Sequence, residues 1–212
     1  MTVEEINLLV KDFFDKEMAP PNPDYEHRVD PDSEKQIYSM IRKFKPETLL
    51  EIGSSHGGST SVIMAAIQKN GNAKGFTSSE LLDDLRTEAE INVLRACGGE
   101  SPVFIGDITK NLHRVPEQLD FLMVDNDHDL ATTVWIFEHI LPRVKKGSLI
   151  VFHDWDIWED DKGLHYKGGE KPSWQETEMM ANMYIQGVLP MEKVFWTYNN
   201  PGVWETSFWT KK

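Results

Sequence analysis

Hydrophobic and polar residues follow two rhythms along the chain, one typical of amphipathic helices and one typical of buried strands. Near the start, apolar side chains recur at helical spacing in residues 2–17 and again in residues 37–44. Ser33 and Gln36 resemble a capping box at the start of the second helix. These patterns predict an N-terminal helical cap followed by a main domain, over residues 1–46 and 47–212 respectively.

The main domain begins with short apolar runs that alternate with helical patterns. The apolar runs predict strands at residues 48–52, 73–78, 102–105, 121–124 and 148–152. The segments between them predict helices at residues 59–69, 81–97 and 131–144. Apolar strands that alternate with helices are typical of a parallel sheet buried on both faces. We therefore predict an α/β fold of three layers, with helices on each side of the sheet.

The pattern changes after residue 154. Residues 155–172 predict a long loop, whose aromatic side chains could cover a bound substrate or pack the loop onto the domain. A helix is predicted at residues 174–188, followed by strands at 193–198 and 203–210. The Asn-Asn-Pro-Gly segment between these strands predicts a hairpin, so the sheet should end in antiparallel strands. The tryptophans of this hairpin could pack the sheet or form the surface of a homo-oligomer.

Composition narrows the range of partners. The chain has 212 residues, and its 35 acidic and 22 basic side chains give a formal net charge of −13. Because such a surface repels phosphate backbones, we expect no nucleic acid partner. No apolar run approaches the roughly 20 residues of a membrane span, and we expect neither a membrane partner nor a signal peptide. The single cysteine, Cys97, cannot form an internal disulfide and fits a cytoplasmic location.

The most informative segment is Glu51-Ile52-Gly53-Ser54-Ser55-His56-Gly57-Gly58-Ser59. It joins a predicted strand to a helix through a glycine-rich turn, which lets backbone amides approach a ligand closely. Glu51 places negative charge where a phosphate-binding loop would avoid it. We therefore expect a ligand that is a positively charged nucleoside rather than a di- or triphosphate.

Polar residues also follow the other predicted strands. Open parallel sheets bind ligands at the carboxyl ends of their strands, so these residues should gather at one edge. After the glycine-rich turn, they are Ser79, Glu80, Asp107, Asp125, Asp127, His128, His153 and Asp154.

Together these segments resemble the class I S-adenosylmethionine-dependent methyltransferases. Residues 51–59 are similar to the first motif of that family. Val124-Asp125-Asn126-Asp127-His128 and Ile150-Val151-Phe152-His153-Asp154 are similar to segments of a branch that includes macrolide- and coumarin-sugar O-methyltransferases and cephalosporin-hydroxylase-like proteins. The resemblance covers about residues 47–156. It implies a Rossmann-like methyltransferase fold with a mostly parallel seven-stranded sheet and an antiparallel C-terminal hairpin strand.

The resemblance implies S-adenosylmethionine as the cofactor. Gly53 and its neighbours would pass under the methionine end, and Glu51 would support that turn or contact the ammonium group. Asp107 and Ile108 would lie near the adenine. The complete set of expected cofactor-binding residues is Glu51, Gly53, Ser54, Ser55, Ser59, Ser79, Glu80, Asp107, Ile108 and Asp125.

The resemblance also implies a divalent metal held by Asp125, His153 and Asp154, with Asp125 and His128 as the catalytic residues. Carboxylate oxygens suit Mg²⁺, whereas an imidazole ligand at His153 would favour Mn²⁺ or Fe²⁺. The metal would orient an acceptor hydroxyl and lower its pKa, and His128 could then take the proton as general base. The implied reaction is O-methylation of a hydroxylated small molecule such as a sugar or another natural product.

One position departs from the family pattern. The acid that binds the cofactor ribose should fall near Thr77, and Glu80 would have to replace it. Two alternative functions remain open at this point. One is a cephalosporin-hydroxylase-like enzyme on the same fold, and the other is a module that binds a cofactor or ligand without turnover.

Overall fold

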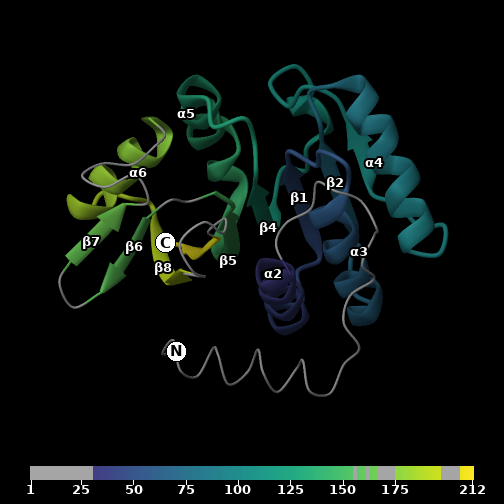
Figure 1. The fold of residues 1–212 in the computed structure, drawn as a ribbon, viewed down its shortest axis with the longest axis horizontal. Helices are drawn as coiled ribbons and strands as arrows, with labels where there is room; N and C mark the ends of the chain where they lie inside the picture. Colours follow the sequence, from purple (N-terminus) through teal and green to yellow (C-terminus); the bar gives the residue numbers. More distant parts are fainter. Residues whose placement is uncertain (1–30, 155–156, 161–162, 167–174, 197–205) are drawn as a thin grey trace.

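The structure, a computed structural model, describes residues 31–154, 157–160, 163–166, 175–196 and 206–212. The described part of the chain forms three layers, with a central sheet between two layers of helices (Figure 1). The strands of this sheet are β1 (Thr48–Ile52), β2 (Gly75–Ser79), β3 (Val103–Ile105), β4 (Leu119–Val124), β5 (Val144–Phe152), β8 (Met191–Trp196) and β9 (Ser207–Lys211). The α-helices are α2 (Pro31–Phe44), α3 (Gly58–Asn70), α4 (Asp83–Ala96), α5 (Leu130–His139) and α6 (Gln175–Ile185).

The order of strands across the seven-stranded sheet is β3-β2-β1-β4-β5-β9-β8. The pairings from β3 to β5 are all parallel, whereas β9 is antiparallel to both β5 and β8. The chain moves outward from β1 to β3 and then returns to place β4 on the other side of β1. The strand order therefore reverses between β1 and β4, which is where open α/β sheets form a ligand crevice.

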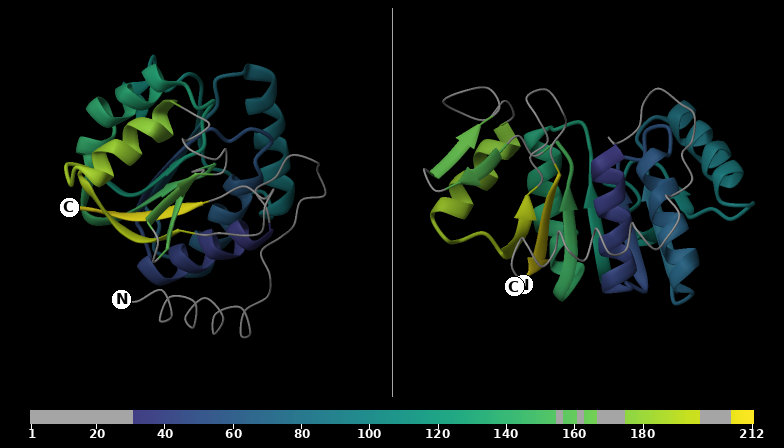
Figure 2. Two further views of the ribbon diagram at one scale, coloured as in Figure 1. Left: turned by 60° about the vertical axis from the view of Figure 1, so that its left-hand side comes forward. Right: turned by 60° about the horizontal axis from the view of Figure 1, so that its bottom comes forward.

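Alternate residues of each strand face opposite layers of helices. Leu49 of β1 belongs to the core that includes side chains of α2, α3 and α4. Leu50 and Ile52 belong to the core on the other face, which includes side chains of α5 and α6. Figure 2 shows the two helical layers on opposite sides of the sheet. Since successive strand side chains point to opposite faces, a fully buried sheet needs the near-continuous apolar strands of this sequence.

Helix ends follow local sequence signals. Gly71 caps the end of α3; it has a φ of 69° and donates its amide hydrogen to the carbonyl oxygen of Ile67. Helix α5 ends at His139, and a short 3-10 helix (Leu141–Arg143) that contains Pro142 leads into β5. A second 3-10 helix (Leu112–Arg114) precedes β4. Pro142 lacks an amide hydrogen, so it cannot continue an α-helix.

The structure confirms the predicted fold class, the mostly parallel seven-stranded sheet and the antiparallel C-terminal pair. The predicted strand at residues 48–52 coincides with β1, and the helix predicted at 59–69 agrees with α3 to within one residue at each end. The predicted helix at residues 2–17 and the Asn-Asn-Pro-Gly turn lie outside the described residues. The division into a cap and a main domain stays a prediction.

Three details of the prediction were wrong. Ser33 lies inside α2 rather than before it, so it is no capping residue, and its Oγ instead accepts a hydrogen bond from Thr206 Oγ1 at 2.8 Å. Strand β5 begins at Val144, where a helix had been expected, because this residue pairs with Leu119 of β4. The expected loop at 155–172 contains a separate antiparallel pair, β6 (Ile157–Asp160) and β7 (Gly163–Tyr166).

Among the residues that the structure describes, none of the helices has the length and apolar composition that a membrane span requires.

Candidate functional site

A cavity of about 450 Å³ opens at the carboxyl ends of the parallel strands, where the strand order reverses. This volume lies within the usual range for small-molecule and cofactor sites. The turns after β1, β2, β3 and β4 all contribute to it. Its lining residues are Ile52, Gly53, Ser55, Ser79, Glu80, Leu81, Leu82, Asp107, Ile108, Thr109, Asp125, Asn126, Asp127 and Thr132.

The floor of the cavity is formed by a close approach of two backbone segments at Gly53. Gly53 has a φ of +89°, and a Cβ atom built on it would lie 1.8 Å from the backbone oxygen of Asp125. The Gly53 amide also donates a hydrogen bond to the Ser79 carbonyl oxygen at 2.9 Å. Only glycine fits this position, because it has no Cβ atom and tolerates a positive φ. The turns after β1, β2 and β4 therefore meet at one point.

Glu51 is fully buried below this turn and faces α3 rather than the cavity. Its carboxylate accepts hydrogen bonds from Ser59 Oγ at 2.6 Å, Thr60 Oγ1 at 2.6 Å and Ser78 Oγ at 2.7 Å. Burial raises the pKa of Glu51 to about 7, although the three hydroxyl donors act in the opposite direction. The contacts of Glu51 tie the start of α3 to β1 and β2.

Glu80 directly follows β2 and lines the cavity. Its Oε2 accepts a hydrogen bond from the Ser55 amide at 2.8 Å, and its Oε1 accepts one from the Leu82 amide at 3.0 Å. An ionised carboxylate has about four acceptor positions, so two remain for hydroxyl groups of a ligand. The observed end of β2 is Ser79, one residue later than predicted, which puts an acid directly after the strand.

Asp107 and Ile108 form the wall of the cavity that follows β3. The Asp107 carboxylate accepts hydrogen bonds from the amide and hydroxyl of Thr109, at 2.9 and 2.7 Å, and pairs with Lys110 Nζ at 2.9 Å. Lys110 and Thr109 together lower the pKa of Asp107 below its ordinary value. These contacts fix the turn that places the buried side chain of Ile108 at the cavity.

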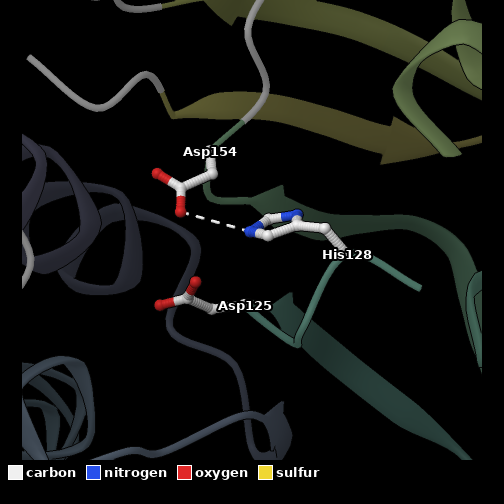
Figure 3. Close-up of side chains that lie close together, drawn as sticks. All are labelled: Asp125, His128 and Asp154. Carbon is white, nitrogen blue, oxygen red and sulfur yellow. Dashed lines mark hydrogen bonds and ion pairs between the residues drawn. The ribbon is translucent and has the colours of Figure 1, made fainter. Parts of the chain in front are cut away.

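A second group of polar side chains lies beside the cavity, at the ends of β4 and β5. Asp125, His128 and Asp154 each offer a potential metal ligand, and these three ligand atoms all lie within 4.8 Å of one another. Figure 3 shows the Nε2 edge of the His128 ring turned toward Asp154, with Asp125 next to both. The distance between His128 Nε2 and Asp154 Oδ2 is 3.2 Å. His128 and Asp154 also have left-handed backbones, with φ values of 57° and 54°.

Two further residues surround this group. Glu176 of α6 is buried, and its Oε1 lies 3.1 Å from Nδ1 of His128. His153 Nδ1 lies 3.3 Å from an oxygen of Asp125 and 3.3 Å from an oxygen of Asp154. Burial alone would lower the pKa of His128, but the neighbouring carboxylates of Asp154, Glu176 and Asp125 raise it above its ordinary value. The three carboxylates therefore favour the protonated, positively charged form of the His128 ring.

The donor set of this group fits a divalent cation. Two carboxylates and one imidazole are ligands that Mn²⁺ and Fe²⁺ accept, and the carboxylates alone suit Mg²⁺. The family resemblance implies His153 as the imidazole ligand and His128 as the base. In the described residues the group of three contains His128, whereas His153 contacts both aspartates from beside it.

The predicted cofactor-binding residues divide into two sets. Gly53, Ser55, Ser79, Glu80, Asp107, Ile108 and Asp125 line the cavity. Glu51, Ser54 and Ser59 are buried and do not line it. Ser59 instead donates to Glu51, so this pair supports the turn from below.

Sequence reasoning missed several residues of the site. Leu81 and Leu82 line the cavity and are 59% and 57% exposed. The sequence signal for them is an apolar pair that directly follows an acid at the end of a strand. Glu176 was also missed. It lies four residues before Met180 on the buried side of α6, and an acid on the apolar side of a predicted helix is a recognisable signal.

The sequence profile of a protein family described as "Methyltransferase domain" matches residues 50–155. No curated protein has a matching sequence. Among solved structures, the O-methyltransferase from Bacillus cereus in complex with S-adenosylhomocysteine has a TM-score of 0.65 at 17% identity, over 98% of this chain and 90% of that one.

Two other solved structures show the same fold. TomG from Streptomyces achromogenes, an O-methyltransferase involved in tomaymycin synthesis and solved with S-adenosylmethionine, has a TM-score of 0.64 at 14% identity, over 100% of this chain and 91% of that one. The methyltransferase PaMTH1 from Podospora anserina, solved with S-adenosylhomocysteine, has a TM-score of 0.62 at 13% identity, over 100% of this chain and 89% of that one.

Proposed function

Because this chain is a methyltransferase and belongs to the methyltransferase domain family, we propose that it transfers the methyl group of S-adenosylmethionine to a hydroxyl oxygen of a small molecule. The observation that carries this proposal is the position of the cavity. It lies at the strand-order reversal, beside a group of side chains that could bind a cation and accept a proton. The Bacillus cereus enzyme and TomG, which share the fold, are O-methyltransferases solved with this cofactor or its product.

The cavity lining suits a cofactor that contains ribose, adenine and a positive charge. Glu80 has acceptor positions left for the ribose hydroxyls, and Ile108 with Leu81 and Leu82 offers apolar surface to the flat base. Gly53 leaves room for the methionine end to pass close to the backbone. The carboxylates of Glu80, Asp107, Asp125 and Asp127 line the same cavity and would favour a sulfonium and an ammonium group.

Asp125 and Asp154 are the residues that we propose to hold a divalent cation, with an imidazole beside them. Such a cation, when bound, would orient an acceptor hydroxyl and lower its pKa. The donor chemistry supports this assignment, since Asp125 and Asp154 place hard carboxylate oxygens close to one another. His153, which contacts both aspartates, would orient their carboxylates.

His128 is the residue that we propose as general base. Its Nε2 would accept the proton of the acceptor hydroxyl, while the oxygen forms a bond to the methyl carbon and the carbon–sulfur bond of the cofactor breaks. The products are the methyl ether, S-adenosylhomocysteine and the proton held on His128. The raised pKa makes the neutral ring of His128 a stronger proton acceptor. Much of the acceleration would come from holding the two reactants in place.

The proposal is tested by calorimetry and by methyl transfer. S-adenosylhomocysteine is titrated into the purified full chain with and without Mg²⁺, and isotope-labelled S-adenosylmethionine is then offered with a panel of catechols, sugars and other hydroxylated compounds. We expect binding of the product and label transfer to at least one acceptor, with turnover abolished by a chelator.

The alternatives predict other results. Absence of S-adenosylhomocysteine binding in both conditions would contradict the assigned cofactor. Turnover that resists chelation would contradict only the metal. Cofactor binding without label transfer to any compound of the panel would favour a module without turnover.

A further inference from the structure

The cavities at the carboxyl ends of the strands have a lining of one charge sign. A small cavity of about 20 Å³ lies beside the large one and shares Asn126 with it. Six carboxylates line the two: Glu80, Asp107, Asp125, Asp127, Asp154 and Glu176. Among the residues that the structure describes, no lysine or arginine lines either cavity. A lining of one sign attracts molecules of the opposite charge, which are positive here.

Positive groups would balance part of this charge in the filled site. Lys110 Nζ lies 2.9 Å from Asp107 Oδ2. S-adenosylmethionine carries a sulfonium, an ammonium and a carboxylate, so it brings one net positive charge to the cavity lined by Glu80. The proposed cation at Asp125 and Asp154 brings two more. An acceptor with a negative charge would therefore enter a site that is still negative, which disfavours its binding.

The two carboxylates that take no part in this balance are Glu176 and Asp127. Glu176 Oε1 lies 3.1 Å from Nδ1 of His128. Asp127 forms no ion pair within the described part of the chain, where its hydrogen bond comes from Asn126 Nδ2 at 3.3 Å. Its side chain is exposed and lines the large cavity, so its carboxylate is accessible to a ligand.

Asp127 also lies close to the proposed place of the acceptor hydroxyl. It follows Asp125 by two positions, and two residues of chain span at most about 7 Å. A positive group on the same small molecule can therefore reach Asp127 while the hydroxyl lies at Asp125 and His128.

We infer that the acceptor is a hydroxylated amine and that Asp127 pairs with its ammonium group. The inference rests on the proposed function, because it concerns the acceptor of that reaction. A protonated amine has no lone pair with which to attack the methyl group. The charge that orients the acceptor thus leaves its hydroxyl oxygen as the nucleophile.

The test compares three catechols that differ in the charge of one side chain: dopamine is positive, propylcatechol is neutral and dihydrocaffeate is negative. Calorimetry measures their binding to the full chain in the presence of S-adenosylhomocysteine and Mg²⁺, and label transfer gives kcat/KM. We expect dopamine to bind about tenfold or more tightly than dihydrocaffeate, with propylcatechol between them. The difference should shrink as the salt concentration rises from about 50 to about 500 mM.

Asp127→Asn tests the assigned residue. Because an exposed ion pair contributes little, we expect this variant to bind dopamine about 2–5-fold more weakly and propylcatechol as the wild type does. Asp84→Asn is the matched control, since it removes the same charge from an exposed position of α4 that lines neither cavity. It should bind all three catechols normally.

Dihydrocaffeate binding as tight as that of dopamine, or absence of dopamine binding, would overturn the inference. An equal loss of affinity for dopamine and propylcatechol in Asp127→Asn would do the same. These binding measurements do not need turnover. Selective binding of dopamine without label transfer would contradict the proposed function and leave the ammonium site at Asp127 intact, whereas label transfer that favours dihydrocaffeate would support methyl transfer and overturn the inference.

Discussion

The backbone oxygen of Asp125 occupies the space into which a side chain on Gly53 would project, with only 1.8 Å between that oxygen and a Cβ atom built on the glycine. This contact joins the turn after β1 to the turn after β4 at the point where the strand order of the sheet reverses. The floor of the proposed cofactor site and the first residue of the proposed metal site are therefore held by the same pair of backbone segments.

Replacement of Gly53 tests this contact. In Gly53→Ala the new methyl group must displace the turn after β4, and the alanine must adopt a positive φ. We therefore expect the free energy of unfolding to fall by about 2 kcal/mol or more, and S-adenosylhomocysteine to bind more weakly. Gly71→Ala is the control, because Gly71 also has a positive φ but a Cβ there would meet nothing within 4 Å. Chemical denaturation measures both. Equal destabilisation of the two variants would show that the close approach to Asp125 has no effect.

The buried Glu51 makes stability depend on pH. Its pKa is about 7 in the folded protein, above the ordinary glutamate value of 4.5, so the folded state holds the proton more tightly than the unfolded chain does. The stability that this provides is fully present below about pH 4.5 and is lost as the pH rises through about 7. Relative to Glu51→Gln, we expect the wild-type free energy of unfolding to fall by up to about 3 kcal/mol across this range.

Urea unfolding at a series of pH values measures this difference. Glu90→Gln, which removes an exposed carboxylate from α4, should leave the wild-type pH dependence in place. Parallel curves for the wild type and Glu51→Gln from about pH 4.5 to about pH 8 would contradict the raised pKa of Glu51.

Glu80 is expected to determine cofactor affinity. Glu80→Ala removes the proposed acceptor of the ribose hydroxyls and two hydrogen bonds that shape the turn, from the amides of Ser55 and Leu82. Hydrogen bonds to charged groups contribute about 1.5–3 kcal/mol, so we expect S-adenosylhomocysteine to bind about 10–100-fold more weakly. Calorimetry gives the affinity. Asp84→Asn changes a nearby exposed acid and should bind normally, and wild-type affinity in Glu80→Ala would exclude this role for Glu80.

Asp154 is expected to affect metal binding but not cofactor binding, because it belongs to the group with Asp125 and His128 and does not line the large cavity. In Asp154→Asn we expect Mn²⁺ affinity, measured by electron paramagnetic resonance, to fall by about tenfold or more, since few carboxylates supply the charge. The affinity for S-adenosylhomocysteine should stay within about twofold of the wild type.

Asp127→Asn is the control for this measurement, because Asp127 follows β4, as Asp125 and His128 do, but lies outside the group of three. Unchanged Mn²⁺ affinity in Asp154→Asn, or an equal loss in Asp127→Asn, would contradict the metal site.

Features that depend on local sequence were predictable, and those set by pairing or by distant contacts were not. Strand β1 was predicted with its correct bounds because an apolar run ends at a glycine-rich turn, and the end of α3 was predicted from Gly71. The start of β5 was missed because Lys145, Lys146 and Gly147 resemble a turn. Only pairing with β4 makes this segment a strand.

The same distinction applies to the site. Residues that follow strands could be assigned to one edge of the sheet because the topology of parallel sheets brings those ends together. The contact of Glu176 with His128 could not be predicted in this way, since no local pattern states which helix packs beside the ends of β4 and β5. The one-residue difference at the end of β2 had the same origin, and Glu80 follows that strand directly only because Ser79 pairs with Ile52 and Ile105.

The position of β9 has a consequence for synthesis of the protein in the cell. Strands β5 and β8 lie on either side of β9 in the sheet, but both precede it in the chain. During translation β5 therefore keeps an unpaired edge until residues 207–211 emerge from the ribosome, and such edges favour pairing with other chains. Phe208 and Trp209, which are fully buried, enter the two cores at that moment. A nascent chain halted before β9 should thus be a chaperone client rather than a folded domain.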